Sequence, residues 1–101
     1  MIIYSVTVKI DLDVHEEWIN WMKQEHIAEV LATGKFKHHR FHKVLVQDES
    51  DGITYNVQYY APTMQDYFEY RDDHAPRLQE KGAARFKDKF VAFRTLLKEV
   101  E

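Results

Sequence analysis

The period of the hydrophobic pattern changes along this chain, and each change limits the folds that the chain can adopt. Polar and apolar side chains alternate from Ile2 to Ile10, which is the pattern of a β-strand with one richer apolar face. The spacing then becomes helical, and Trp18, Met22, His26 and Val30 fall on one ridge at i, i+4. The sequence therefore predicts a strand over 2–10 and a helix over 15–32, with a histidine directed toward the core.

Both ends of this predicted helix carry signals. Asp11 or Asp13 is placed to cap its start, and Glu16 and Glu17 would face the positive end of the helix dipole in the first turn. Gly34 stands where a residue in the left-handed conformation commonly ends a helix. These signals predict one helix with clear ends.

Two further strands are expected after this helix, over 36–47 and 53–60. The polar segment 48–52 ends in Gly52 and predicts a turn, so the two strands should form an antiparallel hairpin. Pro62 ends the second of them. A last strand is expected over 90–97, which closes the pattern.

The segment between Pro62 and this last strand predicts a helix in two parts. Thr63 and Asp66 resemble a capping box at its start. His74-Ala75-Pro76 should break or kink it, because proline suits a first turn and removes an interior hydrogen bond.

The order strand-helix-strand-strand-helix-strand defines the expected fold class, α+β. Such a βαββαβ chain forms a four-stranded antiparallel sheet with two helices on one face, the ferredoxin-like arrangement. Alternation along 53–60 assigns Tyr55, Val57 and Tyr59 to the helix side. The opposite face is then mixed polar, with Asn56 and Tyr60 on it, and it is expected to join two copies as a homodimer.

Composition limits the number of domains and the classes of partner. The 101 residues, 45% of them hydrophobic, suit a single domain over 1–101. The net charge of −3 argues against nucleic acid and anionic membranes, which attract a positive field. With no cysteine, thiol chemistry and disulfides are excluded. No export signal or apolar stretch of roughly 18 residues is seen, so we expect a cytoplasmic protein without a membrane partner.

Longer segments carry a family resemblance. The strand MIIY, the helix WINWMKQEHI with its exit VLATGKF, the strand TYNVQYY, the turn HAPRL and the end KFVAFRTLL cover nearly the whole chain. Together they resemble an uncharacterised domain-of-unknown-function family in the dimeric α+β barrel superfamily. The resemblance implies a ferredoxin-like fold and pairing of two copies, but no activity. The wider superfamily includes cofactor-independent monooxygenases, haem-degrading enzymes and muconolactone isomerase-like proteins, and no residue signature of these occurs here.

Five residues are the candidates for ligand binding. His26 lies on an apolar stripe, where a histidine is most often buried and bonded to a carboxylate or carbonyl, although imidazole can also act as a base near neutral pH. Arg94 interrupts an apolar strand, where it would pair with an acidic residue at an edge or hold an anionic ligand. Trp18 and Met22 could form apolar walls, and Tyr59 would need a partner for its hydroxyl.

The sequence gives little indication of a metal site or an RNA-binding site. His38 and His42 share a strand face but stand ~13 Å apart at ~3.3 Å per residue, and His15 and His26 are separated by ~16 Å along a helix. We therefore assign no metal and no cofactor. The basic segment 35–43 suits a solvated edge strand. An RNA-recognition module shares this element order, but 51–56 lacks its basic and aromatic positions.

Two functional classes remain. The leading one is a dimeric small-molecule-binding domain without established catalysis, whose cavity lies between the first helix and the sheet. The alternative is a cofactor-independent oxygenase or isomerase acting on an aromatic or polyketide-like compound, with His26 as base and Arg94 stabilising anionic charge. The two are distinguished by whether His26 and Arg94 converge on an open cavity.

Overall fold

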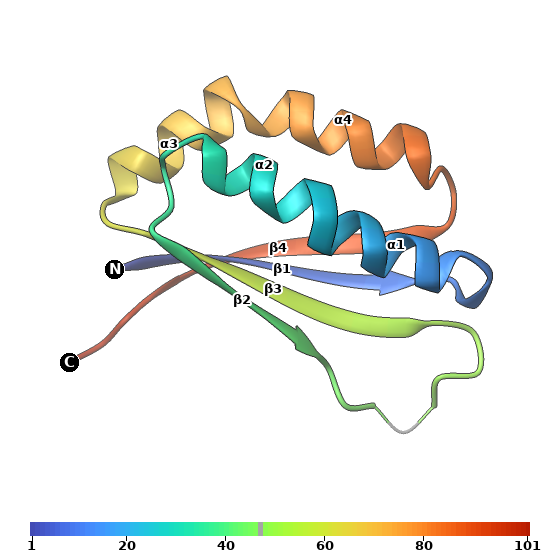
Figure 1. The fold of residues 1–101 in the computed structure, drawn as a ribbon. Helices are drawn as coiled ribbons and strands as arrows, with labels where there is room; N and C mark the ends of the chain where they lie inside the picture. The colour runs from blue at the N-terminus through green and yellow to red at the C-terminus, as the bar shows by residue number, and fades with distance from the viewer. Residues whose placement is uncertain (47) are drawn as a thin grey trace.

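The computed structural model describes residues 1–46 and 48–101, and it places all helices on one face of a four-stranded antiparallel sheet (Figure 1). The predicted ferredoxin-like fold is confirmed. In chain order the elements are β1 (Ile2–Ile10), η1 (Leu12–Val14), α1 (His15–Trp21), η2 (Met22–His26), α2 (Ile27–Ala32), β2 (His38–Lys43), β3 (Ile53–Ala61), α3 (Met64–Asp73), α4 (Ala75–Arg85) and β4 (Phe90–Lys98).

The sheet has the strand order β2-β3-β1-β4, with every neighbouring pair antiparallel. The predicted hairpin of β2 and β3 is present, but β2 is shorter than the expected 36–47, and Gln47 lies outside the described residues. In the register, Val6 pairs with both Val57 and Arg94, so these three side chains share the face toward the helices. β2 is an edge strand with mostly exposed side chains, as the basic segment predicted.

The first helix contains a deviation that the sequence did not predict. The chain is helical from His15 to Ala32, but Met22–His26 forms a π-helical turn between two α-helical parts. A π turn contains an extra residue and therefore rotates the buried face. Trp21 precedes this turn and is buried beside Trp18, three residues earlier, as ordinary helical spacing allows. The π turn instead accompanies the stacking of His26 on Trp21, five residues apart.

The sequence predicted a signal at four helix boundaries, and three of these four predictions are confirmed. Gly34 has a positive φ of 79° after α2, the Thr63 hydroxyl accepts a hydrogen bond from the backbone N–H of Asp66 at 3.2 Å, and His74 separates α3 from α4. The cap by Asp11 or Asp13 was wrong. The turn η1 intervenes, so the residue before α1 is Val14, and the Asp13 carboxylate instead accepts a hydrogen bond from Lys89 Nζ at 2.7 Å.

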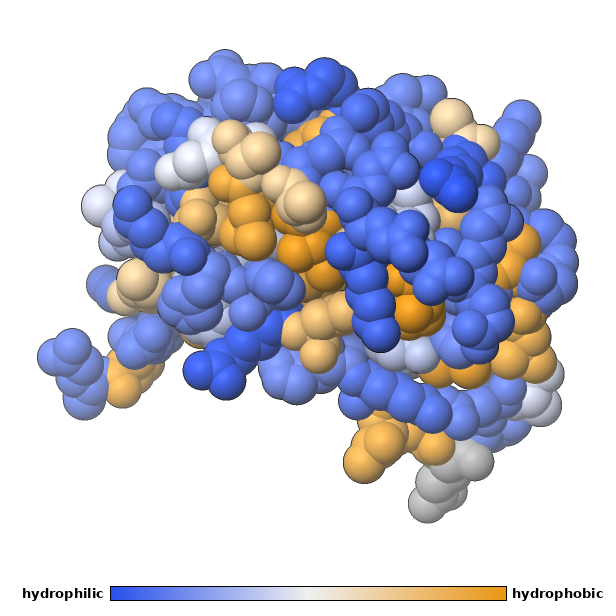
Figure 2. Space-filling view, in the orientation of Figure 1, coloured by the Kyte–Doolittle hydropathy of each residue, from blue (hydrophilic) through white to orange (hydrophobic). Residues whose placement is uncertain are grey.

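The core lies between the helices and the inner face of the sheet and is rich in aromatic rings. The Tyr4 ring lies within 6.1 Å of the rings of Phe36, Tyr59 and Tyr70, measured between centroids. Figure 2 shows hydrophilic side chains over most of the visible face, with apolar ones gathered mainly where the helices meet the sheet. Among the described residues, no helix is long and apolar enough to cross a bilayer.

Candidate functional site

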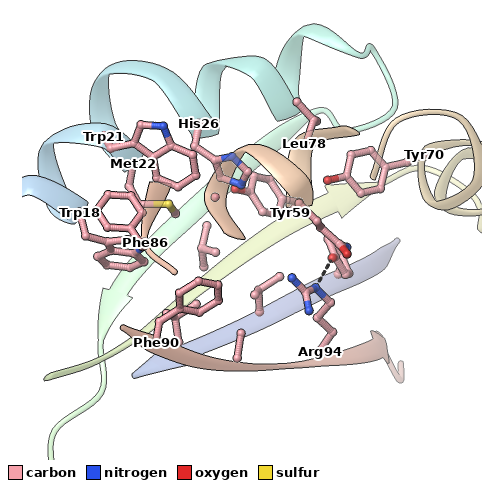
Figure 3. A pocket seen from close by; sticks show the side chains of 17 residues that line it. Trp18, Trp21, Met22, His26, Tyr59, Tyr70, Leu78, Phe86, Phe90 and Arg94 are labelled. Atoms are coloured by element: carbon pink, nitrogen blue, oxygen red, sulfur yellow. Dashed lines mark hydrogen bonds between the residues drawn. The ribbon is translucent and has the colours of Figure 1, made fainter. Parts of the chain in front are cut away.

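A cavity of about 70 Å³ lies between the helices and the inner face of the sheet (Figure 3). The π turn and its neighbours form one wall, α4 forms another, and β1, β3 and β4 form the floor. All five residues proposed from the sequence line this cavity, namely Trp18, Met22, His26, Tyr59 and Arg94. The structure thus brings together side chains from α1, η2, β3 and β4.

Sequence reasoning missed several lining residues. Trp21 was missed because only the i, i+4 ridge was followed, although Trp21 stands three residues after Trp18 and therefore falls on the same helical face. Tyr4 was identifiable, since it stands on the apolar face of the alternating strand β1. Tyr70 and Gly82, from α3 and α4, also line the cavity, but their positions depend on how these helices pack on the sheet.

The cavity has an apolar and a polar part. In Figure 3, Trp18, Trp21, Met22, Phe86 and Phe90 gather at one end, whereas Tyr70 and Arg94 lie toward the other end. His26 and Tyr59 are seen between these two groups. Such a division suits a ligand with an apolar body and one polar or charged group.

His26 is stacked on Trp21, with ring centroids 4.5 Å apart and planes inclined by 22°. Its Nδ1 is buried and has no hydrogen-bond partner among the described residues, so the expected bond to a carboxylate or carbonyl is wrong for this atom. Burial lowers the pKa of His26 to about 4, and the positive charges of Arg94 and Lys81 act in the same direction against Glu29. His26 is therefore neutral near pH 7.

Tyr59 has a second buried polar atom without a partner. The residue is 2% exposed, and its hydroxyl makes no hydrogen bond to any described residue. Burial raises the pKa of Tyr59, with a smaller contribution from Tyr70 and Tyr4, so the hydroxyl keeps its proton and remains a donor. By contrast, Tyr55 is bonded to His15 Nε2 at 2.7 Å.

Arg94 binds a hydroxyl rather than a carboxylate. Its Nε donates to the Tyr4 hydroxyl at 3.0 Å, and the described residues include no acidic partner, so the predicted pairing with an acidic side chain is wrong. The reason is the register, which places Arg94 opposite Val6 and beside a buried tyrosine. Burial raises the pKa of Tyr4, and Arg94 opposes that shift. Arg94 is itself exposed and marks a polar edge of the cavity.

A second recess, of about 300 Å³, lies between α1 and β2. His15, Lys43 and Tyr55 line it, but His15 and Tyr55 are bonded to each other and Lys43 pairs with Glu49 at 3.1 Å. Within residues 1–46 and 48–101, no group of three or more His, Cys, Asp or Glu side chains has the arrangement of a metal site. The cavity beneath the π turn is the stronger candidate site.

The fold and the cavity define a ferredoxin-like α+β domain with an aromatic-walled internal site. The chain belongs to the family described as domain of unknown function DUF4286, whose model matches residues 1–100. A comparison with curated protein sequences gives no match.

Solved structures share the fold at low sequence identity. HapK from Hahella chejuensis superposes with a TM-score of 0.71 at 8% identity, covering 99% of this chain and 93% of its own. A dimeric ferredoxin-like protein from an uncultured marine organism gives 0.64 at 15% identity, covering 100% and 96%. SnoaB, a cofactor-independent oxygenase from Streptomyces nogalater, gives 0.61 at 12% identity, covering 99% and 94%. These similarities establish the fold.

Proposed function

We propose that this protein binds a small, flat, partly apolar molecule that has an anionic or enolisable group. The observation that carries this proposal is a pair of buried polar atoms, His26 Nδ1 and Tyr59 Oη, which have no partner among the described residues and belong to side chains that line one cavity. A buried polar group without a hydrogen bond costs about 1 to 3 kcal/mol. A ligand that bonded to either group would recover part of that cost.

The volume of the cavity limits the size of the ligand. About 70 Å³ holds roughly five to seven water molecules, since one water needs about 10 to 15 Å³ of such space. A compound with a single ring is therefore favoured over a polycyclic one, which narrows the aromatic or polyketide-like class expected from the sequence. The indoles of Trp18 and Trp21 would pack on the faces of such a ring.

The charge at the polar end selects the functional group of the ligand. Arg94 uses Nε for Tyr4, and no hydrogen bond of its two terminal nitrogens to a described residue is seen. A guanidinium with two available nitrogens binds a carboxylate or enolate by paired hydrogen bonds. We therefore place the ligand's acidic group at Arg94 and its ring among the apolar walls.

The chain offers a direct assay for binding. Its two tryptophans, Trp18 and Trp21, both line the cavity, so quenching of intrinsic fluorescence reports on this site. Benzoate, salicylate and phenylpyruvate would be titrated beside the uncharged benzamide. We expect the acids to bind and benzamide to bind more weakly. Loss of a charged hydrogen bond in Arg94→Gln should weaken acid binding about tenfold or more.

A matched control variant is Arg77→Gln, which removes an exposed arginine of α4 outside the cavity. Its affinities should equal those of the original protein. Acids that bind equally well to the Arg94→Gln and Trp18→Phe variants would place the site elsewhere and refute the proposed pocket.

We also propose that two copies pair through the sheet face opposite the helices. On the β4 part of that face Val91, Phe93 and Leu97 are 67%, 65% and 41% exposed. Apolar side chains grouped on one face commonly mark an interface. A structural neighbour is itself described as a dimeric ferredoxin-like protein, which supports the same arrangement here.

Light scattering tests this pairing. We expect a mass of twice the 12.1 kDa of one chain at micromolar concentration, and a shift toward one chain for Phe93→Glu. Leu12→Glu, which changes a residue of η1 that is 48% exposed, should keep the original mass. A mass of one chain for the unaltered protein would contradict the proposal. The expected cytoplasmic location remains a separate prediction, which cell fractionation would check.

A further inference from the structure

We infer that the cavity catalyses proton transfer on its ligand, with the His26 imidazole removing a proton from a carbon next to a carbonyl and Tyr59 with Arg94 stabilising the enolate. This inference rests on the proposed binding function and adds an activity to it. It predicts a substrate class: small, single-ring 2-oxo acids or 1,3-dicarbonyl compounds. These are planar in the enol form and carry the oxygen atoms that the polar end of the cavity would bind.

The position of His26 supports the role of base. The imidazole extends from the π turn toward the cavity and is flanked by Trp21 rather than by a carboxylate (Figure 3). An uncharged imidazole without an internal partner has a lone pair free for a substrate proton. The charged groups that act on it are Glu29, Lys81 and Arg94. Burial has the largest effect on the pKa of His26 and keeps the ring unprotonated before the substrate enters, while Glu29 opposes this effect and Arg94 and Lys81 add to it.

Donors to the developing oxygen anion lie in the same cavity. The Tyr59 hydroxyl is buried and forms no hydrogen bond to a residue in 1–46 or 48–101, so it can donate to an enolate oxygen without first losing a bond to one of them. Arg94 is held by Tyr4 through Nε and supplies positive charge at the polar end. Donors fixed before the reaction stabilise the charge of the transition state at little reorganisation cost.

The proposed step is balanced without an oxidant or a cofactor. The imidazole nitrogen forms a bond to the proton, the C–H bond breaks, and its electron pair forms a carbon–carbon double bond. The carbonyl π pair moves onto oxygen, which Tyr59 and Arg94 bind. The imidazolium then returns the proton to that oxygen, giving the enol, or to a carbon atom, giving the keto form or an isomer.

The low basicity of the partly buried imidazole restricts the substrates further. A weak base removes protons only from acidic carbon atoms, which is why activated carbonyl compounds are favoured over simple ketones. Negative charge developing beside the ring favours its protonated form and increases its basicity as the proton moves. The restriction therefore follows from the same burial that keeps His26 neutral.

Phenylpyruvate in D₂O is the probe, with loss of its methylene proton signal followed by NMR and binding followed by tryptophan fluorescence. The unaltered protein should accelerate exchange above the protein-free rate. His26→Gln should reduce the acceleration on the order of a hundredfold, and Tyr59→Phe by a similar factor, while both still quench fluorescence. His39→Gln, which changes an exposed histidine of β2 outside the cavity, should exchange like the unaltered protein.

The outcomes separate the activity from the binding. Quenching without accelerated exchange in the unaltered protein would overturn the proton transfer and leave the binding function standing. Accelerated exchange that persists in His26→Gln would overturn the role of His26. The absence of both quenching and exchange would overturn the activity together with the proposed binding of planar acids. Thermal melts of each variant establish that the fold is retained.

Discussion

The stability of this protein should depend on pH through one partly buried histidine. The pKa of His26 is about 4 in the folded protein, whereas the ordinary value is 6.5. Between these values the unfolded chain binds a proton at His26 and the folded chain does not. Acid therefore favours unfolding. The loss of unfolding free energy due to His26 is absent above pH 6.5 and grows as the pH falls toward 4.

The size of the effect follows from the two pKa values. One pKa unit corresponds to about 1.4 kcal/mol, so the full difference amounts to about 3 kcal/mol below both values. Between pH 7 and pH 4.5 the linkage relation gives about 2 kcal/mol of lost unfolding free energy from His26 alone. The negative charge of Glu29 opposes the lowering of the His26 pKa, but the burial of the ring, which is stacked on Trp21, has the larger effect.

Urea denaturation at pH 7 and at pH 4.5 measures this contribution. The other titrating groups are common to the unaltered protein and to His26→Gln, so their effects cancel when the two pH dependences are subtracted. We expect the variant to lose about 2 kcal/mol less on acidification. His39→Gln should behave like the unaltered protein, because the His39 side chain contacts water in the folded state as well. Equal pH dependences for His26→Gln and the unaltered protein would refute the reasoning.

Three other substitutions give separate tests. Gly82→Ala should leave stability unchanged or slightly higher, because alanine has the higher helix propensity. It should weaken ligand binding, because the new Cβ would lie 3.1 Å from the Trp21 ring and push the ring into the cavity. Thermal melts measure the first effect and fluorescence titrations the second. Thr63→Ala should cost about 1 kcal/mol by removing the cap on the N–H of Asp66, and Thr63→Ser should restore most of it in the same urea assay. His26→Ala should cost about 1 to 3 kcal/mol at pH 7, since it removes the ring stacked on Trp21; an unchanged melting midpoint would show that the ring is not structural.

Local signals in the sequence determined the elements and their order. Alternation fixed the two faces of β1 and β3, because side chains on a strand alternate by geometry alone, and the register confirms that Tyr59 faces the helices. Gly34, Thr63 and Pro76 marked helix boundaries through backbone conformation and hydrogen bonding that depend on neighbouring residues only. The five candidate residues were found in the same way, as exceptions within regular patterns.

Tertiary structure decided how these exceptions are used. The π turn separates Trp21 from His26, which stacks on it from five residues further along, and no local periodicity predicts that extra residue. The register of β4 gives Arg94 the Tyr4 hydroxyl instead of a carboxylate, since the partner lies 90 residues away in sequence. Whether a buried polar atom has a partner depends on every element packed around it. The sequence therefore predicted which residues to question, and only the packing of helices on the sheet left His26 Nδ1 and the Tyr59 hydroxyl without a partner in the described part of the chain, around one cavity.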